Sequence, residues 1–227
     1  MSIRLVVFDM AGTTIRDDDA VNRCLREALQ AGGVEVSRDE VNRVMGIPKP
    51  AAIAALLAIG RVAGGDVPPE VIADLHAEFL RRMLDFYHGD PSVAPMPGVQ
   101  DCFERLRRCG VRLALDTGFS RDIVDVILRR LGWDATGFLD ATVASDEVPR
   151  GRPHPDLIFE AMRRTGVSSA RSVAKVGDTP SDLQEGTAAG CGLVIGVTNG
   201  THTRTQLLPH PHTHLIGSLH ELPALCH

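Results

Sequence analysis

The chain has 227 residues, of which 44% are hydrophobic and 23% are charged, a balance typical of a globular enzyme. Its formal net charge of −5 argues against a surface that binds nucleic acid or an anionic membrane. The longest apolar stretch, residues 51–59, is too short to cross a bilayer, and the N-terminus lacks the pattern of a signal peptide. An anionic substrate must therefore be attracted by a local cluster of positive charge.

The cysteines and lysines also carry information. The cysteines are odd in number and lack metal-type spacing, so we interpret them as reduced thiols in a cytoplasmic protein. They are Cys24, Cys102, Cys109, Cys191 and Cys226. Only Lys49 and Lys175 are lysines among 24 basic side chains. Because lysine can lose its proton and arginine cannot, a retained lysine can mark a place where an amine is needed; chance survival under a codon bias is the alternative.

The predicted elements begin with a short apolar run at 3–8, which we expect to be a buried strand. A series of helical patterns follows, and Ser37 with Glu40 has the spacing of a capping box at the second of them. These patterns cover residues 20–31, 38–44, 50–59 and 69–86. We therefore predict an all-helical cap domain at 17–90, inserted after the first strand, with residues 1–16 and 91–227 forming the core domain.

After the predicted cap, apolar runs alternate with amphipathic patterns. The runs lack strict alternation, which is typical of strands buried on both faces. They cover residues 111–115, 141–144, 173–176 and 193–197, and the helical patterns cover 99–108, 121–131 and 155–164. The expected fold class is α/β, with a doubly wound, mainly parallel, Rossmann-like sheet.

Four aspartates follow predicted strands at once or within two residues: Asp9, Asp116, Asp146 and Asp178. Because ligands of a doubly wound sheet bind beyond the carboxyl ends of its strands, we expect these side chains to converge there. Converging carboxylates repel one another unless a hard cation such as Mg²⁺ lies among them. The alternative for each aspartate is an ordinary helix cap.

Four motifs in the right order resemble those of the haloacid dehalogenase superfamily. They are Val6–Thr14 (VVFDMAGTT), Asp116–Gly118 (DTG), Gly151–Pro153 (GRP) and Gly177–Asp182 (GDTPSD). The resemblance implies that Asp9 attacks phosphorus and becomes an aspartyl-phosphate. It also implies that the second oxygen of Asp9, the carbonyl of Ala11 and the carboxylate of Asp178 hold Mg²⁺, with Asp182 as an outer ligand or orienter.

The same resemblance implies that Thr117 and Gly118 bind phosphate oxygens and that Arg152 neutralises the transferring group. Most phosphatases of the superfamily carry a second Asp two positions after the nucleophile, as a general acid for an oxygen leaving group. That position is Ala11 here, which transfers no proton. A halide leaving group, or a carbon leaving group with an electron sink, tolerates this loss.

Within the superfamily, the spelling Asp-x-Ala-Gly-Thr and the Arg of the third motif resemble the phosphonoacetaldehyde hydrolase subfamily. Its lid motif, Met-Gly-x-x-Lys, appears here as residues 45–49, which adds Met45 and Lys49 to the candidate site. The resemblance implies that Lys49 forms a Schiff base with a substrate aldehyde. The chain departs from the subfamily at Ala52, where a His is expected, at Phe119, where a hydroxyl is expected, and at Asp116, where Thr is usual.

Elementary electrostatics supports this role for Lys49. The amine must be neutral to attack an aldehyde, against a reference pKa of about 10.4. Lys49 precedes Pro50, which is well placed to open a helix, and an ammonium is disfavoured both at a helix N-terminus and under a closed lid. An iminium at Lys49 accepts electrons as a C–P bond breaks, so no acid is needed at Ala11.

We therefore expect hydrolysis of the C–P bond of a 2-oxoalkylphosphonate such as phosphonoacetaldehyde. The alternatives are a Mg²⁺-dependent small-molecule phosphatase, a haloacid dehalogenase, a phosphoglucomutase, which Ala11 disfavours, and a silent regulatory protein on the same scaffold. We expect a small-molecule phosphonate or phosphate substrate, no nucleic-acid or membrane partner, and a homodimer through the cap, which related enzymes suggest. His210, His212 and His214 alternate and are either a surface loop or a metal site.

Overall fold

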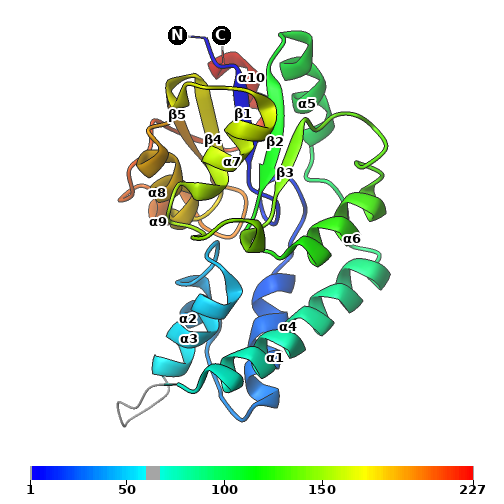
Figure 1. Ribbon diagram of the computed structural model, residues 1–227, viewed down its shortest axis with the longest axis vertical. Helices are drawn as coiled ribbons and strands as arrows, with labels where there is room; N and C mark the ends of the chain where they lie inside the picture. The colour runs from blue at the N-terminus through cyan, green and yellow to red at the C-terminus, as the bar shows by residue number, and fades with distance from the viewer. Residues whose placement is uncertain (1, 60–66, 227) are drawn as a thin grey trace.

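The computed structural model describes residues 2–59 and 67–226, and its centre is one parallel sheet in the order β3-β2-β1-β4-β5-β6 (Figure 1). The strands are β1 (Leu5–Phe8), β2 (Arg112–Asp116), β3 (Ala141–Val143), β4 (Val173–Gly177), β5 (Leu193–Val197) and β6 (His214–Ile216). All neighbouring strands pair in parallel. The chain builds the sheet outward from β1 in both directions, so the topological switch point lies between β1 and β4.

The five strands expected from apolar runs are confirmed, with ends that shift by up to two residues. The sixth strand, β6, was not predicted because it has only three residues, two of them half-exposed, and therefore lacks an apolar run. Alternate residues of β1 face opposite apolar clusters: Phe8 lies in one with Phe103, and Val7 lies in the other with Leu157. This two-sided burial explains why the strands read as continuous apolar runs.

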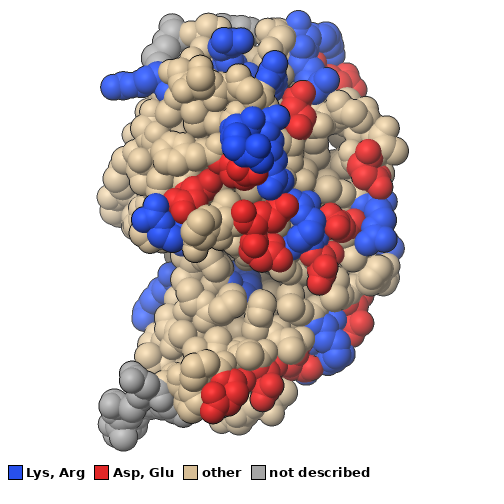
Figure 2. All heavy atoms as spheres, viewed as in Figure 1, with Lys and Arg blue, Asp and Glu red and all other residues tan. Residues whose placement is uncertain are grey.

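Helices cover both faces of the sheet. They are α5 (Val99–Arg108), α6 (Arg121–Leu131), α7 (Asp156–Thr165), α8 (Pro180–Ala189), α9 (Arg204–Leu207) and α10 (Leu222–Leu225). Phe103 of α5 and Leu157 of α7 fill the clusters on the two sides of β1. Within the described residues, no helix is both long and apolar enough to cross a membrane. Acidic and basic side chains are interspersed on the face drawn in Figure 2.

Four helices between β1 and α5 form a group, here called the helical insert, that lies beyond the carboxyl end of β1 (Figure 1). They are α1 (Ala20–Ala31), α2 (Arg38–Asn42), α3 (Lys49–Ile59) and α4 (Pro69–Gly89). The predicted capping box opens α2: the Glu40 amide donates to Ser37 Oγ at 3.2 Å, and the Ser37 amide donates to Glu40 Oε2 at 2.7 Å. The helices agree with the expected patterns, whereas the domain boundaries at 16/17 and 90/91 stay a prediction.

Candidate active site

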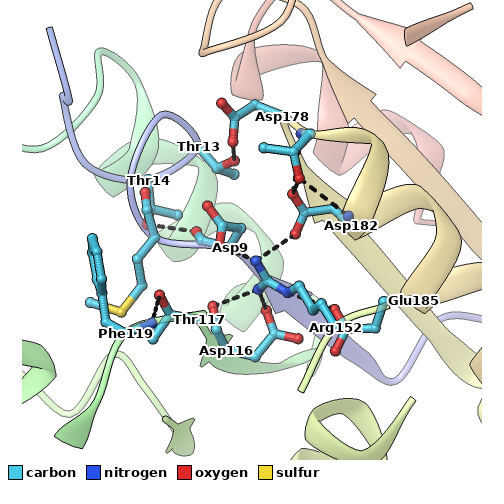
Figure 3. A network of polar contacts seen from close by, with 12 residues as sticks. Asp9, Thr13, Thr14, Asp116, Thr117, Phe119, Arg152, Asp178, Asp182 and Glu185 are labelled. Carbon is cyan, nitrogen blue, oxygen red and sulfur yellow. Dashed lines mark hydrogen bonds and ion pairs between the residues drawn. The ribbon is translucent and has the colours of Figure 1, made fainter. Parts of the chain in front are cut away.

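Three of the four strand-end aspartates meet at the carboxyl edge of the sheet (Figure 3). Asp9 follows β1, Asp116 ends β2 and Asp178 follows β4, and all three are buried. They converge because β1 pairs with β2 on one side and with β4 on the other. The expectation that Asp146 joins them is wrong. Asp146 lies on a 3₁₀ turn after β3, is exposed, and accepts a hydrogen bond from the Arg121 amide at 3.0 Å, near the start of α6.

The carboxylate of Asp9 is held on one side only. Its Oδ1 accepts a hydrogen bond from Arg152 Nη1 at 2.6 Å, and its Oδ2 accepts none from the described residues. The Thr14 hydroxyl donates to the Asp9 carbonyl at 2.9 Å, which fixes the turn after β1. Burial raises the pKa of Asp9 to about 7, Arg152 opposes this rise, and Asp182 and Asp178 add to it. Oδ2 is therefore the oxygen available for attack.

The donor set beside Asp9 fits a hard divalent cation. Carboxylate oxygens of Asp9, Asp178 and Asp182 lie within 4.8 Å of one another, and all three side chains are buried. Burial and the charge of Asp182 raise the pKa of Asp178 to about 6. An all-oxygen group of buried carboxylates is the environment that Mg²⁺ prefers, and a cation there offsets their repulsion. A cluster of aspartates able to bind a metal is thus present.

Two threonines orient Asp178. The Thr13 hydroxyl donates to Asp178 Oδ1 at 2.9 Å, and the Thr201 amide donates to Asp178 Oδ2 at 2.6 Å. Each oxygen keeps a further lone pair for a cation. Thr13 lies inside the first motif, but Thr201 comes from the loop after β5 and follows no recognisable pattern, so sequence reasoning missed it.

Thr117 and Gly118 lie on the same cavity as Asp9, as do Ala11, Met45, Lys49 and Arg152. The Thr117 hydroxyl oxygen accepts from the Phe119 amide at 3.2 Å, which leaves its proton for a further acceptor. The Gly118 amide donates no hydrogen bond to any other described residue. Two neutral donors therefore border the space in front of Asp9. Among the predicted site residues, Asp178 and Asp182 lie behind the cavity wall rather than on it.

Arg152 is buried among carboxylates rather than directed into open space (Figure 3). Its three nitrogens contact five protein oxygens, which equals the number of its N–H groups. These oxygens are Asp9 Oδ1, Asp182 Oδ1, Glu185 Oε2, the Asp116 carbonyl and Asp116 Oδ1. A direct bond from Arg152 to a phosphoryl oxygen thus requires exchange of one of these partners.

Lys49 is the first residue of α3, and its side chain is buried, with 4% of the residue exposed. The side chain makes no hydrogen bond or ion pair with the described part of the chain. Its Nζ lies 5.7 Å from the centre of the Phe119 ring and 5.9 Å from that of Phe79. Burial lowers the pKa of Lys49 to about 8, and Asp9 and Asp17 oppose the fall. About a tenth of this amine is therefore neutral at pH 7, far more than for a lysine with the usual pKa.

The other lysine, Lys175, is paired. Although burial opposes its charge, Asp116, Glu185 and Asp182 raise its pKa above the usual value. Its Nζ contacts carboxylate oxygens of all three. These contacts make Lys175 a structural partner of the neighbouring carboxylates.

The loop before α3 packs tightly on the core, and glycines make the fit possible. A Cβ on Gly118 would lie 2.9 Å from the Ile47 carbonyl oxygen, and one on Gly151 would lie 2.2 Å from Pro48 Cγ. Gly46 similarly meets Thr179. The helical insert is therefore closed over the cavity.

The histidines near the C-terminus form no comparable site. No cluster of possible metal ligands in the described residues includes His210, His212 or His214. His214 opens β6, and His212 Nδ1 lies 2.7 Å from the His210 carbonyl oxygen.

The chain is similar to known proteins over most of its length. Residues 6–196 match the family model described as haloacid dehalogenase-like hydrolase. The phosphonoacetaldehyde hydrolase of Bacillus cereus is 31% identical over 209 residues, covering 86% of this chain and 77% of the relative, and that of Bacillus cytotoxicus gives the same figures. These identities are high enough to indicate common descent over most of the chain.

Solved structures show the same fold. A phosphonoacetaldehyde hydrolase-like protein from Oleispira antarctica superposes with a TM-score of 0.88 at 22% identity, covering 100% of this chain and 92% of that one. A predicted phosphoglycolate phosphatase from Haemophilus somnus superposes with a TM-score of 0.81 at 18% identity, covering 99% and 98%. At these identities the likeness concerns the fold alone.

Proposed function

The chain belongs to the haloacid dehalogenase-like hydrolases, and within this family we propose that it cleaves the C–P bond of a 2-oxoalkylphosphonate such as phosphonoacetaldehyde. One observation carries the proposal: Lys49, a buried amine with a lowered pKa and no ion-pair partner among the described residues, lies on the same cavity as Asp9. An amine of this kind is suited to form an imine, and the carboxylate is suited to attack phosphorus. The relatives named phosphonoacetaldehyde hydrolase support the same chemistry.

The first step is imine formation. Neutral Lys49 attacks the substrate carbonyl, and loss of water with uptake of one proton leaves an iminium next to the carbon that bears phosphorus. The apolar walls formed by Phe79 and Phe119 keep bulk water away from the amine. The iminium then serves as the electron sink for the next step.

The second step transfers the phosphoryl group to Asp9. Its free Oδ2 attacks phosphorus, the C–P bond breaks, and the electron pair moves into the iminium to give an enamine. Thr117 and the Gly118 amide bind phosphoryl oxygens, while Arg152 supplies positive charge beside the transferring group through its bond to Asp9. Because the leaving group is a carbon whose electron pair passes into the iminium, no general acid is needed at the position of Ala11.

The cycle closes by two hydrolyses. Water cleaves the aspartyl-phosphate to release inorganic phosphate and restore Asp9. The enamine takes a proton on carbon, and water hydrolyses the resulting imine to release the aldehyde or ketone and restore Lys49. Dividing one displacement into two steps lowers the barrier of each.

We assign the cation site to Asp9, the carbonyl of Ala11 and Asp178, with Asp182 as orienter and Mg²⁺ as the ion. When bound, the ion offsets the negative charge shared by the nucleophile and the phosphoryl group. Met45, which lines the cavity beside Lys49, supports the substrate carbon chain. Residues 17–90 act as the cap domain. Cytoplasmic location and a homodimer through this cap stay predictions.

A second candidate is a Mg²⁺-dependent small-molecule phosphatase in which Lys49 only binds substrate. It is favoured by the side chains around Lys49: Ala52 and Phe119 lack the imidazole and hydroxyl of the phosphonoacetaldehyde hydrolase pattern. In this case Lys49→Ala raises KM for phosphate esters and spares kcat.

Borohydride trapping tests the proposal. Incubation with phosphonoacetaldehyde and borohydride is expected to reduce the imine and add the substrate carbon chain to Lys49, as seen by peptide mass analysis. Lys175 is an internal control, since it is fully buried and paired and should stay unmodified. Lys49→Arg is expected to abolish turnover. Phosphate release without modification of Lys49 would contradict the imine mechanism and favour the phosphatase hypothesis. Under either hypothesis, phosphate release should vanish in Asp9→Asn and in the presence of a chelator.

A further inference from the structure

A buried charge network lies beneath Asp9, and the proposed chemistry uses only Arg152 and Asp182 of its members. Figure 3 shows Arg152 between Asp9, Asp116, Asp182 and Glu185. The side chains of Arg152, Asp116, Asp182 and Glu185 have no exposed area. Burying charges costs free energy unless they are paired with good geometry, so a network of this size is expected to hold a functional group in place.

Arg152 is hydrogen-bonded on both flanks of its guanidinium group, an arrangement here called the grip. On one side its Nε donates to Glu185 Oε2 at 2.9 Å. On the other side its Nη2 donates to the Asp116 carbonyl at 2.9 Å and also to Asp116 Oδ1. The remaining nitrogen, Nη1, faces Asp9 Oδ1 at 2.6 Å and Asp182 Oδ1 at 3.0 Å. Because a guanidinium is planar and rigid, bonds on both flanks determine the direction of Nη1.

Lys175 joins the two sides of this grip. Its Nζ contacts Asp116 Oδ1 and lies 3.0 Å from Glu185 Oε2, the same two oxygens that hold Arg152. The members come from separate elements: Asp116 ends β2, Lys175 lies within β4, and Glu185 lies on α8. The grip is therefore anchored on both strands that flank β1 and its Asp9.

We propose that Asp116 and Glu185 are positioning residues that clamp Arg152, so that Arg152 holds Asp9 Oδ1 and leaves Oδ2 free to attack phosphorus. The inference rests on the proposed function only in taking Asp9 as the nucleophile. It also gives Asp116 a reason to be acidic, since a hydroxyl at this position has no charge with which to hold both cations. Arg152 then acts on the nucleophile first and on the phosphoryl group through it.

The alternative is that the network only stabilises the fold, and isosteric variants distinguish this from a role in positioning Arg152. Asp116→Asn and Glu185→Gln keep the shape of each side chain and remove its charge. Glu160→Gln is a matched control, because Glu160 bonds Arg163 and Arg164 on α7, away from the cavity. Each variant is compared with the parent in kcat, KM and melting temperature. Misorientation of a reacting group costs up to about 100-fold, so we expect kcat to fall roughly 10- to 100-fold with KM within about threefold.

A second readout needs no substrate. Beryllium fluoride with Mg²⁺ forms a phosphoryl-like adduct on an aspartate nucleophile, and ¹⁹F NMR measures its affinity. We expect Asp116→Asn and Glu185→Gln to weaken the adduct about tenfold or more and Glu160→Gln to leave it unchanged. If the wild-type chain forms the adduct but does not hydrolyse phosphonoacetaldehyde, the proposed substrate fails and this inference stands.

Arg152→Lys covers the case in which a clamp variant does not fold. Lysine keeps the charge but cannot bridge acceptors on two flanks, so kcat and adduct affinity should fall as in the clamp variants. A crystal structure of Glu185→Gln should show the guanidinium turned away from Asp9 Oδ1. The inference is overturned if the clamp variants lose melting temperature but keep the parent kcat and adduct affinity, or if Arg152→Lys keeps the parent kcat.

Discussion

Lys49 and Phe119 line the same cavity as Asp9, with Lys49 Nζ 5.7 Å from the centre of the Phe119 ring. Phe79 of α4 lies at a similar distance from the same nitrogen. Burial is the main cause that lowers the pKa of Lys49 to about 8, and the carboxylates of Asp9 and Asp17 oppose the fall. The structure thus keeps this amine close to the point at which it gains and loses its proton.

Replacing the amine should stabilise the fold. Holding a buried ammonium whose pKa falls from 10.5 to about 8 costs on the order of 3 kcal/mol at pH values below 8. Lys49→Met fills the same space without charge, so its melting temperature should exceed that of the parent while turnover is lost. The unfolded chain binds more protons than the folded chain between pH 8 and 10.5, so the parent regains stability there and the difference should shrink. Melting curves at pH 7 and pH 9.5 measure this; an equal difference at both contradicts it.

The pH–rate profile should report the same amine. Imine formation needs neutral Lys49, so kcat/KM should rise with pH and level off above about 8. Asp17 raises the pKa of Lys49, and Asp17→Asn should therefore move the rising limb to lower pH. The Asn oxygen still accepts the hydrogen bond that the Val21 amide gives at 2.9 Å. Asp18→Asn is the control, because Asp18 is exposed and does not perturb Lys49. Equal shifts in both variants would contradict a specific effect of Asp17 on the pKa of Lys49.

Sequence reasoning found the residues that depend on strand ends and motifs. Asp9 and Asp178 follow apolar runs, and the order of the strands brings them together. The same rule failed at Asp146 because the chain turns into a 3₁₀ segment after β3 and the side chain faces solvent. Phe79 was not predictable as a neighbour of Lys49, since only the packing of α4 against α3 places it there.

The hydrogen-bond partners of Arg152 could not be predicted from the sequence either. The third motif indicates a cation near the phosphate. How many N–H groups of Arg152 are already bonded, however, depends on residues from β2 and α8. Local patterns determine which residues lie at the site, whereas their hydrogen-bond partners depend on distant segments.

Magnesium should bind to the folded protein through Asp178. A ligand that binds only the folded state raises the melting temperature, so Mg²⁺ is expected to stabilise the parent. Asp178→Asn should abolish this response. It should also stabilise the metal-free protein near pH 7, because burial raises the pKa of Asp178 to about 6 and its charge is unfavourable above that pH. Thermal melts with Mg²⁺ and with chelator measure both effects, and an unchanged Mg²⁺ response in Asp178→Asn argues against the assigned site.

Closure of the helical insert should depend on Gly118. A Cβ there would lie 2.9 Å from the Ile47 carbonyl and 3.0 Å from that of Gly46, so Gly118→Ala should keep the loop before α3 away from the core. We expect kcat/KM to fall by about 100-fold through misplacement of Lys49. Gly89→Ala is the control, since a Cβ at Gly89 would meet no atom of the described residues within 4 Å. Comparable losses in the two variants would contradict the role of close packing at Gly118.

A carboxyl group at position 11 should change the leaving group that the site accepts. Ala11 is half-buried and lines the cavity with Asp9 and Lys49. In Ala11→Asp the new acid can protonate an ester oxygen, and general acid catalysis contributes about 10²- to 10⁴-fold, so hydrolysis of alkyl phosphates should rise. p-Nitrophenyl phosphate should gain little, because its leaving group departs without a proton.

The same substitution should weaken C–P cleavage. A new carboxylate near Lys49 favours the ammonium and raises its pKa, so less neutral amine is present at pH 7 to 8. Ala11→Asn is the matched control, because it has the same size and transfers no proton. The measurement is the ratio of kcat/KM for an alkyl phosphate to that for phosphonoacetaldehyde. That ratio should rise in Ala11→Asp alone; an equal rise in Ala11→Asn would mean that the size of residue 11, rather than proton transfer, selects the leaving group.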